Sequence, residues 1–227
     1  MRRALLSFLL LSTFCAPAFA QATAAAVQEQ DWAAFIGPFP RVDSDEGKAD
    51  LAIVLWHQRT RTAAEVQRAT AEVKLLLGAY SEAMGQPLDA VRFPKTAALI
   101  DQVGKDIKAK TDGLKKQFGR PRPYLADARV QPAIEREMSP SYPSGHATRG
   151  VAFARVLAEL APSRQDALLA CGRQVGVHRV IGGVHYPSDI EAGQRLGLKL
   201  AEIWLADPLN RAQVNLARIV EWPEPKP

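Results

Sequence analysis

Apolar positions recur about every 3.6 residues along most of the chain, and this period predicts α-helices. Prolines, glycines and helix-capping residues interrupt the pattern and divide it into separate helices. The predicted helices cover residues 43–60, 62–85, 94–115, 145–161, 168–177, 188–206 and a short segment from 208. We find no internal repeat and no convincing strand, so the predicted fold class is all-α, a single-domain helical bundle.

Local signals set several of the helix boundaries. Asp43 with Glu46 is interpreted as the cap of the first long helix, and Thr62 with Glu65 has the pattern of a capping box. Pro94 suits the first turn of the next helix. Three segments fall outside this pattern: Trp32 to Arg41 is interpreted as an extended strap, Phe118 to Pro143 as a loop across the site, and 222–227 as a tail.

The N-terminus has the three parts of a secretory signal peptide. Arg2 and Arg3 are followed by an apolar run from Ala4 to Phe14 and by Ala18-Phe19-Ala20, a small-x-small cleavage site. The run is too short for a membrane span, which needs about 20 residues. The sequence therefore predicts a signal peptide over 1–20, an arm and strap over 21–41 and a helical domain over 42–221, in a periplasmic or secreted protein.

Charge and cysteine content narrow the class of partner. The formal net charge of +5 falls to +3 without the two arginines of the signal peptide, so the charge gives no reason to expect nucleic acid as a partner, which would need clustered Lys and Arg.

Cys15 would leave with the signal peptide, which leaves Cys171 alone and excludes an intramolecular disulfide. No other long apolar segment exists, so we expect no stable membrane insertion.

Three short blocks carry the chemistry. Lys115, Arg122 and Arg179 could surround the oxygens of a phosphate, because arginine binds phosphate in a bidentate manner and lysine adds a point charge. Ser144 and Gly145 form a turn into a predicted helix, where free amide N–H groups favour anions. Taken singly, a Lys or Arg is usually a solvated surface residue, although Arg122 stands in the rigid Arg120-Pro-Arg122-Pro123 loop, and a Ser-Gly turn is usually an ordinary helix cap.

Two histidines and a carboxylate add a nucleophile and an acid. His185 and Asp189 are four residues apart at a predicted helix start, so the carboxylate could fix the tautomer of the ring and leave its other nitrogen free to attack. His146 would project beside the bound anion. A metal site is the rival interpretation, but no His-x-x-x-His pair or Cys/His cluster supports it, so we expect no metal and no cofactor.

Taken together, the blocks resemble a known signature. Lys115-x6-Arg122-Pro123, Pro143-Ser144-Gly145-His146 and Arg179-x5-His185-x3-Asp189 are similar to the three-part motif of the type 2 phosphatidic acid phosphatase superfamily. The length, the predicted signal peptide and the Ser141-Tyr-Pro-Ser-Gly-His146 context most resemble its class A bacterial non-specific acid phosphatases. One position departs from the pattern, because His178 stands where the family often has Ser before the arginine of the third block.

The resemblance implies a role for each matched position. His185 would attack phosphorus and form a phosphohistidine, Asp189 would orient it, and His146 would protonate the leaving alcohol and then activate water. The phosphoryl oxygens would be bound by Lys115, Arg122, Ser144, Gly145 and Arg179. The implied enzyme is a metal-independent, vanadate-inhibited acid phosphatase that hydrolyses small phosphate monoesters, and the family is compatible with a homo-oligomer.

Other functions remain open at this point. A vanadium-dependent haloperoxidase carries the same pocket with vanadate as its cofactor. A soluble phosphatase for lipid phosphates or pyrophosphate would use the same residues, and a phosphate-binding module would need the cations alone. Binding requires neither a nucleophile nor an acid, so the presence of both His146 and His185 favours an enzyme.

Overall fold

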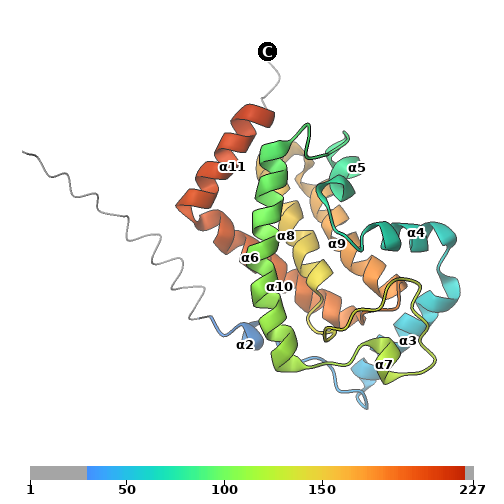
Figure 1. Ribbon diagram of the computed structural model, residues 1–227. Coiled ribbons are helices and arrows are strands. Elements are labelled where there is room, and N and C mark those ends of the chain that lie inside the picture. The colour runs from blue at the N-terminus through green and yellow to red at the C-terminus, as the bar shows by residue number, and fades with distance from the viewer. Residues whose placement is uncertain (1–29, 223–227) are drawn as a thin grey trace, which may run out of the picture.

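The computed structural model describes residues 30–222 of the chain, and all of its regular elements are helical (Figure 1). No strand occurs in this range, which confirms the predicted all-α class. The predicted signal peptide and most of the predicted tail lie outside the described residues. The helices are α2 (Trp32–Ile36), α3 (Asp45–Thr60), α4 (Ala63–Ala71), η1 (Leu77–Tyr80), α5 (Ser81–Met84), α6 (Pro94–Phe118), α7 (Pro123–Ala126), α8 (Gly145–Leu160), η2 (Pro162–Arg164), α9 (Gln165–Ile181), α10 (Pro187–Ala206) and α11 (Pro208–Glu221).

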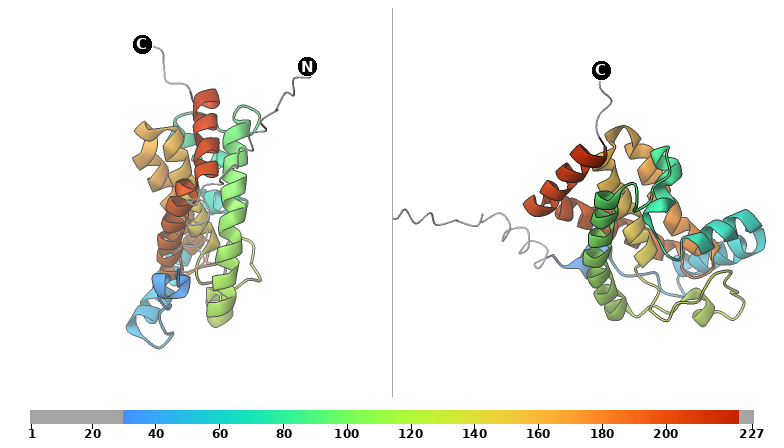
Figure 2. Two further views of the ribbon diagram at one scale, coloured as in Figure 1. Left: turned by 90° about the vertical axis from the view of Figure 1, so that its left-hand side faces the viewer. Right: turned by 45° about the horizontal axis from the view of Figure 1, so that its top comes forward.

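Helix α8 is the centre of the bundle. It packs against α6, α9 and α10, and Figure 2 shows α6 and α11 on the outside of this group. Most of its residues are buried, as expected for a helix that is apolar on nearly every face. The helices approach closely at glycines: a Cβ atom on Gly172 of α9 would lie 2.5 Å from the backbone oxygen of Gly150.

A second close approach between helices brings the predicted site residues together. A Cβ atom on Gly193 of α10 would lie 2.6 Å from the backbone oxygen of Ser144, so α10 closes directly on the N-terminus of α8. The Ser144 amide also donates to the Asp189 carbonyl at 3.0 Å. As a result, the first turns of α8 and α10, which lie about 40 residues apart in the sequence, meet at one end of the bundle.

Several predicted boundaries are confirmed. Thr62 and Glu65 form the predicted capping box at the start of α4. Pro94 occupies the first turn of α6, which runs through Lys115. Gly85 ends α5 with a left-handed φ of 75°, and the Asp207 side chain caps α11. These boundaries depend on contacts within one helical turn, which is why the sequence alone predicts them.

Two local predictions are wrong, and a third holds with small differences. Trp32 to Ile36 forms a helical turn and not a fully extended strap. Ser44, not Asp43, caps α3 by accepting from the Gly47 amide at 3.1 Å, because Asp43 pairs with Arg41. The predicted loop from Phe118 to Pro143 is observed, except that Phe118 is the last residue of α6 and Pro123–Ala126 form the single turn α7.

The predicted helix over 62–85 is also wrong, and the correction matters for the site. Helix α4 ends at Ala71, and the chain turns before η1 and α5. The turn directs Glu72 to His178, at 2.9 Å, and presents the Val73 carbonyl to His146, at 3.1 Å. Tertiary contacts therefore override a local helical pattern.

Candidate active site

The predicted site residues converge from five elements at one end of the bundle. Lys115 lies in the last turn of α6, Arg122 precedes α7, and Arg179 lies in the last turn of α9. Ser144 caps α8 ahead of Gly145 and His146. His185 and Asp189 flank the start of α10. All of these residues except Gly145 are buried, so their charges require partners within the protein.

His185 and Asp189 form the predicted pair. The Nδ1 atom of His185 lies 3.0 Å from Asp189 Oδ2, and Nη1 of Arg122 lies 2.9 Å from Nε2 of the same ring. A guanidinium only donates, so Nε2 accepts and Nδ1 carries the proton. Burial, together with the charges of Arg122 and Lys115, holds the pKa of His185 well below its usual value. Nε2 is therefore an unprotonated nitrogen with a lone pair.

Asp189 is fixed by four donors in all. Besides His185, it accepts from the Tyr186 amide at 2.9 Å, from the Ser141 hydroxyl at 2.5 Å and from Arg120 at 2.7 Å. A carboxylate held by this many donors cannot rotate freely. It therefore holds the His185 ring in one orientation.

Behind Asp189, a buried chain of charges reaches into the N-terminal half of the protein. Arg120 bridges Asp189 and Asp50, which lies on α3 at 2.8 Å from the guanidinium. Asp50 also accepts from the Ser188 amide at 3.1 Å. The sequence analysis did not select Arg120 or Asp50, although Arg120 stands in the rigid Arg120-Pro-Arg122-Pro123 segment.

His146 presents one defined nitrogen to the site. Its Nε2 lies 3.1 Å from the Val73 carbonyl, which only accepts, so Nε2 carries the proton of the neutral ring. Nδ1 faces Glu137, at 3.8 Å, and is the atom that can gain or lose a proton. Burial and the nearby charges of Arg179 and Arg149 lower the pKa of His146 to about 4.

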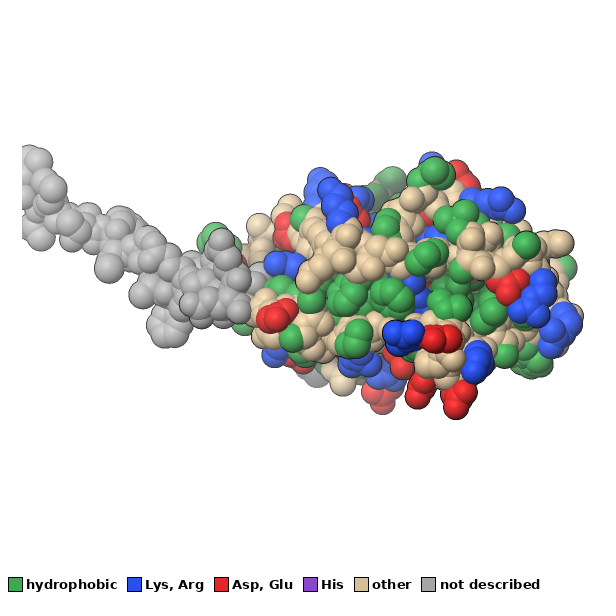
Figure 3. Space-filling model, turned by 90° about the horizontal axis from the view of Figure 1, so that it is seen from below, with side chains coloured by type: hydrophobic (Ala, Val, Ile, Leu, Met, Phe, Trp, Pro, Cys, Tyr) green, Lys and Arg blue, Asp and Glu red, His purple; other side chains and the backbone are tan. Residues whose placement is uncertain are grey.

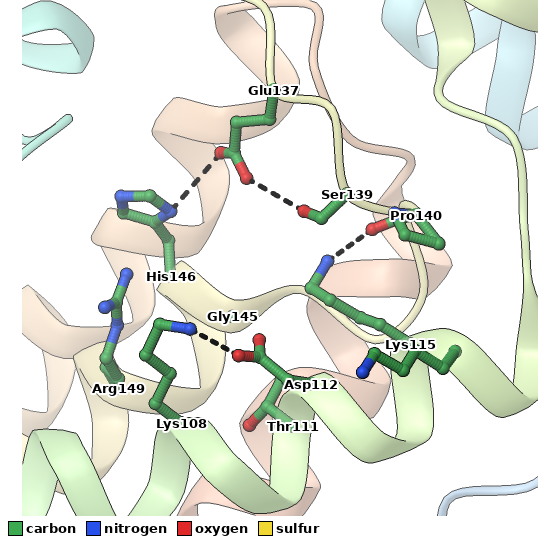
Figure 4. A pocket seen from close by; sticks show the side chains of 11 residues that line it. Lys108, Thr111, Asp112, Lys115, Glu137, Ser139, Pro140, Gly145, His146 and Arg149 are labelled. Carbon is green, nitrogen blue, oxygen red and sulfur yellow. Dashed lines mark hydrogen bonds and ion pairs between the residues drawn. The ribbon is translucent and has the colours of Figure 1, made fainter.

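Glu137 is the residue of the site that the motifs did not reveal. Its carboxylate lies 2.6 Å from Arg122 Nη2, beside His146 and within the field of Lys115 (Figure 4). Burial acts to raise its pKa, but the positive charges, Arg122 first, outweigh it and lower that pKa to about 2. Tyr124 fixes the backbone of Glu137 through its hydroxyl, at 2.7 and 3.1 Å. A carboxylate thus lies where several cations can hold an anion.

Lys115 and Arg179 retain capacity for an anion. The Lys115 ammonium faces the carbonyls of Pro140 and Ser141, and burial lowers its pKa to about 7. Arg179 donates to the Ala69 carbonyl and lies 3.7 Å from Glu72, while its buried Nε has no acceptor among the described residues. An unsatisfied buried donor is unfavourable, and an oxygen of a bound phosphate would satisfy it.

Two cavities meet at the loop that carries Glu137. The first, of about 440 Å³, is lined by Lys115, Gly145 and His146, and the second, of about 400 Å³, by Arg179. Glu137 and Ser139 line both. His185 is fully buried against Arg122 and lines neither of these cavities.

His178 has a clear structural role. Its Nδ1 donates to the Glu72 carboxylate at 2.9 Å, and the same carboxylate lies near Arg179. His178 thus sits near the end of α9 and contacts a partner of Arg179. Among residues 30–222, no group of three or more His, Cys, Asp or Glu residues is arranged to hold a metal ion.

Comparison with known proteins identifies the class. A sequence profile of the PAP2 superfamily matches residues 98–212, and the chain therefore belongs to this superfamily of phosphatases. The result confirms the resemblance and the enzyme class predicted from the motifs. The matched segment contains every residue of the predicted site, whereas Asp50 and Glu72 lie before it.

Two of the related proteins are bacterial acid phosphatases. The chain is 29% identical to a non-specific acid phosphatase of Providencia stuartii over 82% of this chain and 86% of the relative. It is 33% identical to an acid phosphatase of Zymomonas mobilis over 59% of this chain, but the match spans only 52% of that protein.

A solved structure supports the fold. The crystal structure of a transmembrane PAP2-type phosphatidylglycerolphosphate phosphatase from Bacillus subtilis matches with a TM-score of 0.56, at 22% identity, over 86% of this chain and 94% of that chain. Within residues 30–222, no helix has the length and apolar character of a membrane span.

Proposed function

We propose that the protein is an acid phosphatase that hydrolyses phosphate monoesters through a phosphohistidine at His185. The observation that carries this proposal is the state of the His185 ring, with Nδ1 bound to Asp189 and an unprotonated Nε2 directed at the guanidinium of Arg122. In this tautomer the Nε2 lone pair lies on the side of the cation cluster, as a nucleophile that attacks a bound phosphoryl group requires. The acid phosphatase names of two relatives support the same activity.

In the first step, the phosphoryl group replaces the Glu137 carboxylate among Lys115, Arg122 and Arg179. Nε2 of His185 forms a bond to phosphorus while the ester P–O bond breaks. The electron pair of that bond goes to the leaving oxygen, which takes a proton from Nδ1 of His146. Positioning and charge stabilisation supply most of the catalysis in such phosphoryl transfers.

In the second step, water attacks the phosphohistidine. His146, now neutral, accepts a proton from the water through Nδ1, and the N–P bond breaks to release phosphate and restore His185. Burial and the nearby arginines lower the pKa of His146 to about 4. A phosphate ester brings more negative charge than the single carboxylate it replaces, so binding raises the pKa of His146 and favours its protonated form.

The N-terminal signal predicted from the sequence supports export to the periplasm or beyond. N-terminal sequencing of the protein recovered from a periplasmic fraction should give a chain that begins at Gln21. A chain that still begins at Met1 would contradict the export proposal.

Hydrolysis of p-nitrophenyl phosphate at about pH 5–6, in excess EDTA, tests the activity. Turnover that survives the chelator and is blocked by vanadate is the expected result. Absence of turnover by folded protein would contradict the phosphatase proposal, and bromide oxidation by the vanadate-loaded protein would favour the haloperoxidase alternative.

The molecular surface agrees with a small substrate. Lys and Arg side chains are interspersed with Asp and Glu on the face seen from below in Figure 3. A mixed surface of this kind does not favour a long polyanion such as nucleic acid, which requires clustered positive charge.

A further inference from the structure

The first cavity continues beyond the residues assigned to the transferred phosphoryl group. Its inner end is formed by Lys115 and His146, and it extends between α6 and α8 to Arg149, Lys108 and Asp112 (Figure 4). The volume of about 440 Å³ is more than a phosphoryl group needs. The extension is therefore space available to a leaving group.

Arg149 is a cation without a partner in this extension. It is half-buried, and it makes no hydrogen bond or ion pair with any described residue. Its Nε atom is buried and has no acceptor within residues 30–222. By contrast, the guanidinium groups of Arg120 and Arg122 are engaged by carboxylates. A partly desolvated guanidinium with free donors favours binding of an anion.

The carboxylates of the cavity do not satisfy Arg149. Asp112 is paired with Lys108 across one turn of α6, and Glu137 is paired with Arg122. In Figure 4 the Asp112 carboxylate points to the Lys108 ammonium, and the guanidinium of Arg149 lies on the His146 side of the cavity. An anion bound in the extension would therefore contact Arg149, with Lys108 next to it.

The position of Arg149 relates it to the leaving group. Arg149 follows His146 by three residues on α8, so the two side chains share one face of the helix, with Cβ atoms roughly 5–6 Å apart. In the proposed mechanism Nδ1 of His146 protonates the leaving oxygen, and His146 and Arg149 line the same cavity, so a leaving group that enters this cavity can reach Arg149.

We propose that Arg149, with Lys108 beside it, forms a second anion subsite for the leaving group. The preferred substrates are phosphate monoesters or anhydrides whose leaving group carries its own carboxylate or phosphate a few bonds from the scissile oxygen. This inference rests on the proposed function, because it assigns the leaving group to the cavity next to His146.

The test compares 3-phosphoglycerate with glycerol 3-phosphate. The two esters share a carbon skeleton, but the first has a carboxylate where the second has a neutral CH2OH group. We expect Arg149→Gln to lower the ratio of their kcat/KM values about tenfold, since a charge-assisted hydrogen bond is lost. Arg149→Lys should keep most of the ratio. Arg173→Gln, the same change at an exposed position on α9, should leave it unchanged.

The ratio separates a subsite from an indirect effect. Arg149 also lowers the pKa of His146, but a change in that pKa affects both esters alike. An equal loss with both esters in Arg149→Gln would overturn the subsite. Pyrophosphate as a third substrate shows whether a phosphate or a carboxylate depends more strongly on Arg149.

Calorimetry keeps the inference testable if the protein hydrolyses neither ester, and p-nitrophenyl phosphate tests the proposed function separately. Methylenebisphosphonate, which is not hydrolysed, would be compared with inorganic phosphate. A selective loss of affinity for the bisphosphonate in Arg149→Gln supports the subsite. Equal changes for the two ligands would overturn it.

Discussion

Replacing Asp50 by Ala is expected to destabilise the fold by about 3–5 kcal/mol, because it breaks a buried ion pair. The guanidinium of Arg120 lies 2.8 Å from Asp50 and 2.7 Å from Asp189. The side chain of Arg120 is 5% exposed, that of Asp50 is 7% exposed and that of Asp189 is 0% exposed. Water therefore screens these charges little, in contrast to a surface salt bridge.

The hydrogen bonds that Asp50 accepts give the size of the expected destabilisation. Alanine would leave Nη2 of Arg120 and both donors of Ser188 without this acceptor. Each buried donor left unsatisfied costs about 1–3 kcal/mol, and the Ser188 hydroxyl can rotate to recover part of its share. A loss near the lower limit, about 3 kcal/mol, corresponds to a fall in Tm of roughly 6–12 °C for a chain of this size.

Scanning calorimetry at neutral pH measures this fall, with Asp101→Ala as the control. Asp101 pairs with Lys105 at 2.6 Å, but its side chain is 65% exposed, so its loss should cost less than about 1 kcal/mol. Equal Tm values for the two variants would refute the claim that the Asp50–Arg120–Asp189 chain stabilises the site.

Three further predictions concern the chemistry. Asp189→Asn should lower kcat roughly 100-fold or more in steady-state assays while phosphate inhibition changes little, because the His185 tautomer is lost; equal losses in both would make Asp189 structural. Glu137→Gln should strengthen inhibition by inorganic phosphate about five- to tenfold, because the Glu137 carboxylate no longer competes with phosphate for Arg122. Weaker inhibition would refute the idea that Glu137 and phosphate compete. Lysine is charged below its pKa, so kcat/KM should fall as the pH rises through about 7, the pKa of Lys115. In Lys115→Arg this fall should disappear from the pH profile, and an unchanged profile would exclude Lys115 as its cause.

The sequence predicts the part of the site that depends on short spacings. Ser144, Gly145 and His146 stand at a helix start, and His185 and Asp189 are four residues apart across another. Their relations are set within one or two turns of chain, so the pattern of residues determines them once the helices form.

The remaining part depends on long-range contacts that leave little local signal. Glu137 lies in a loop, and its contact with Arg122 and His146 requires the folded chain. Asp50 precedes the buried Val54 by four residues, which places it on the inner face of α3, but a single polar residue there does not reveal its partner Arg120, 70 positions away. The local pattern favours a helix that continues beyond α4. The structure ends α4 before Glu72, whose carboxylate contacts His178 instead.

The most direct test of the account is isolation of the covalent intermediate. Protein mixed with a ³²P-labelled phosphate monoester and quenched in base should carry label that is lost in acid, as expected for a phosphohistidine, and peptide mapping should place it on the peptide that contains His185. The His185→Ala variant should retain the helical circular dichroism spectrum and carry no label. Turnover without label at His185, or full activity in His185→Ala, would contradict the central claim.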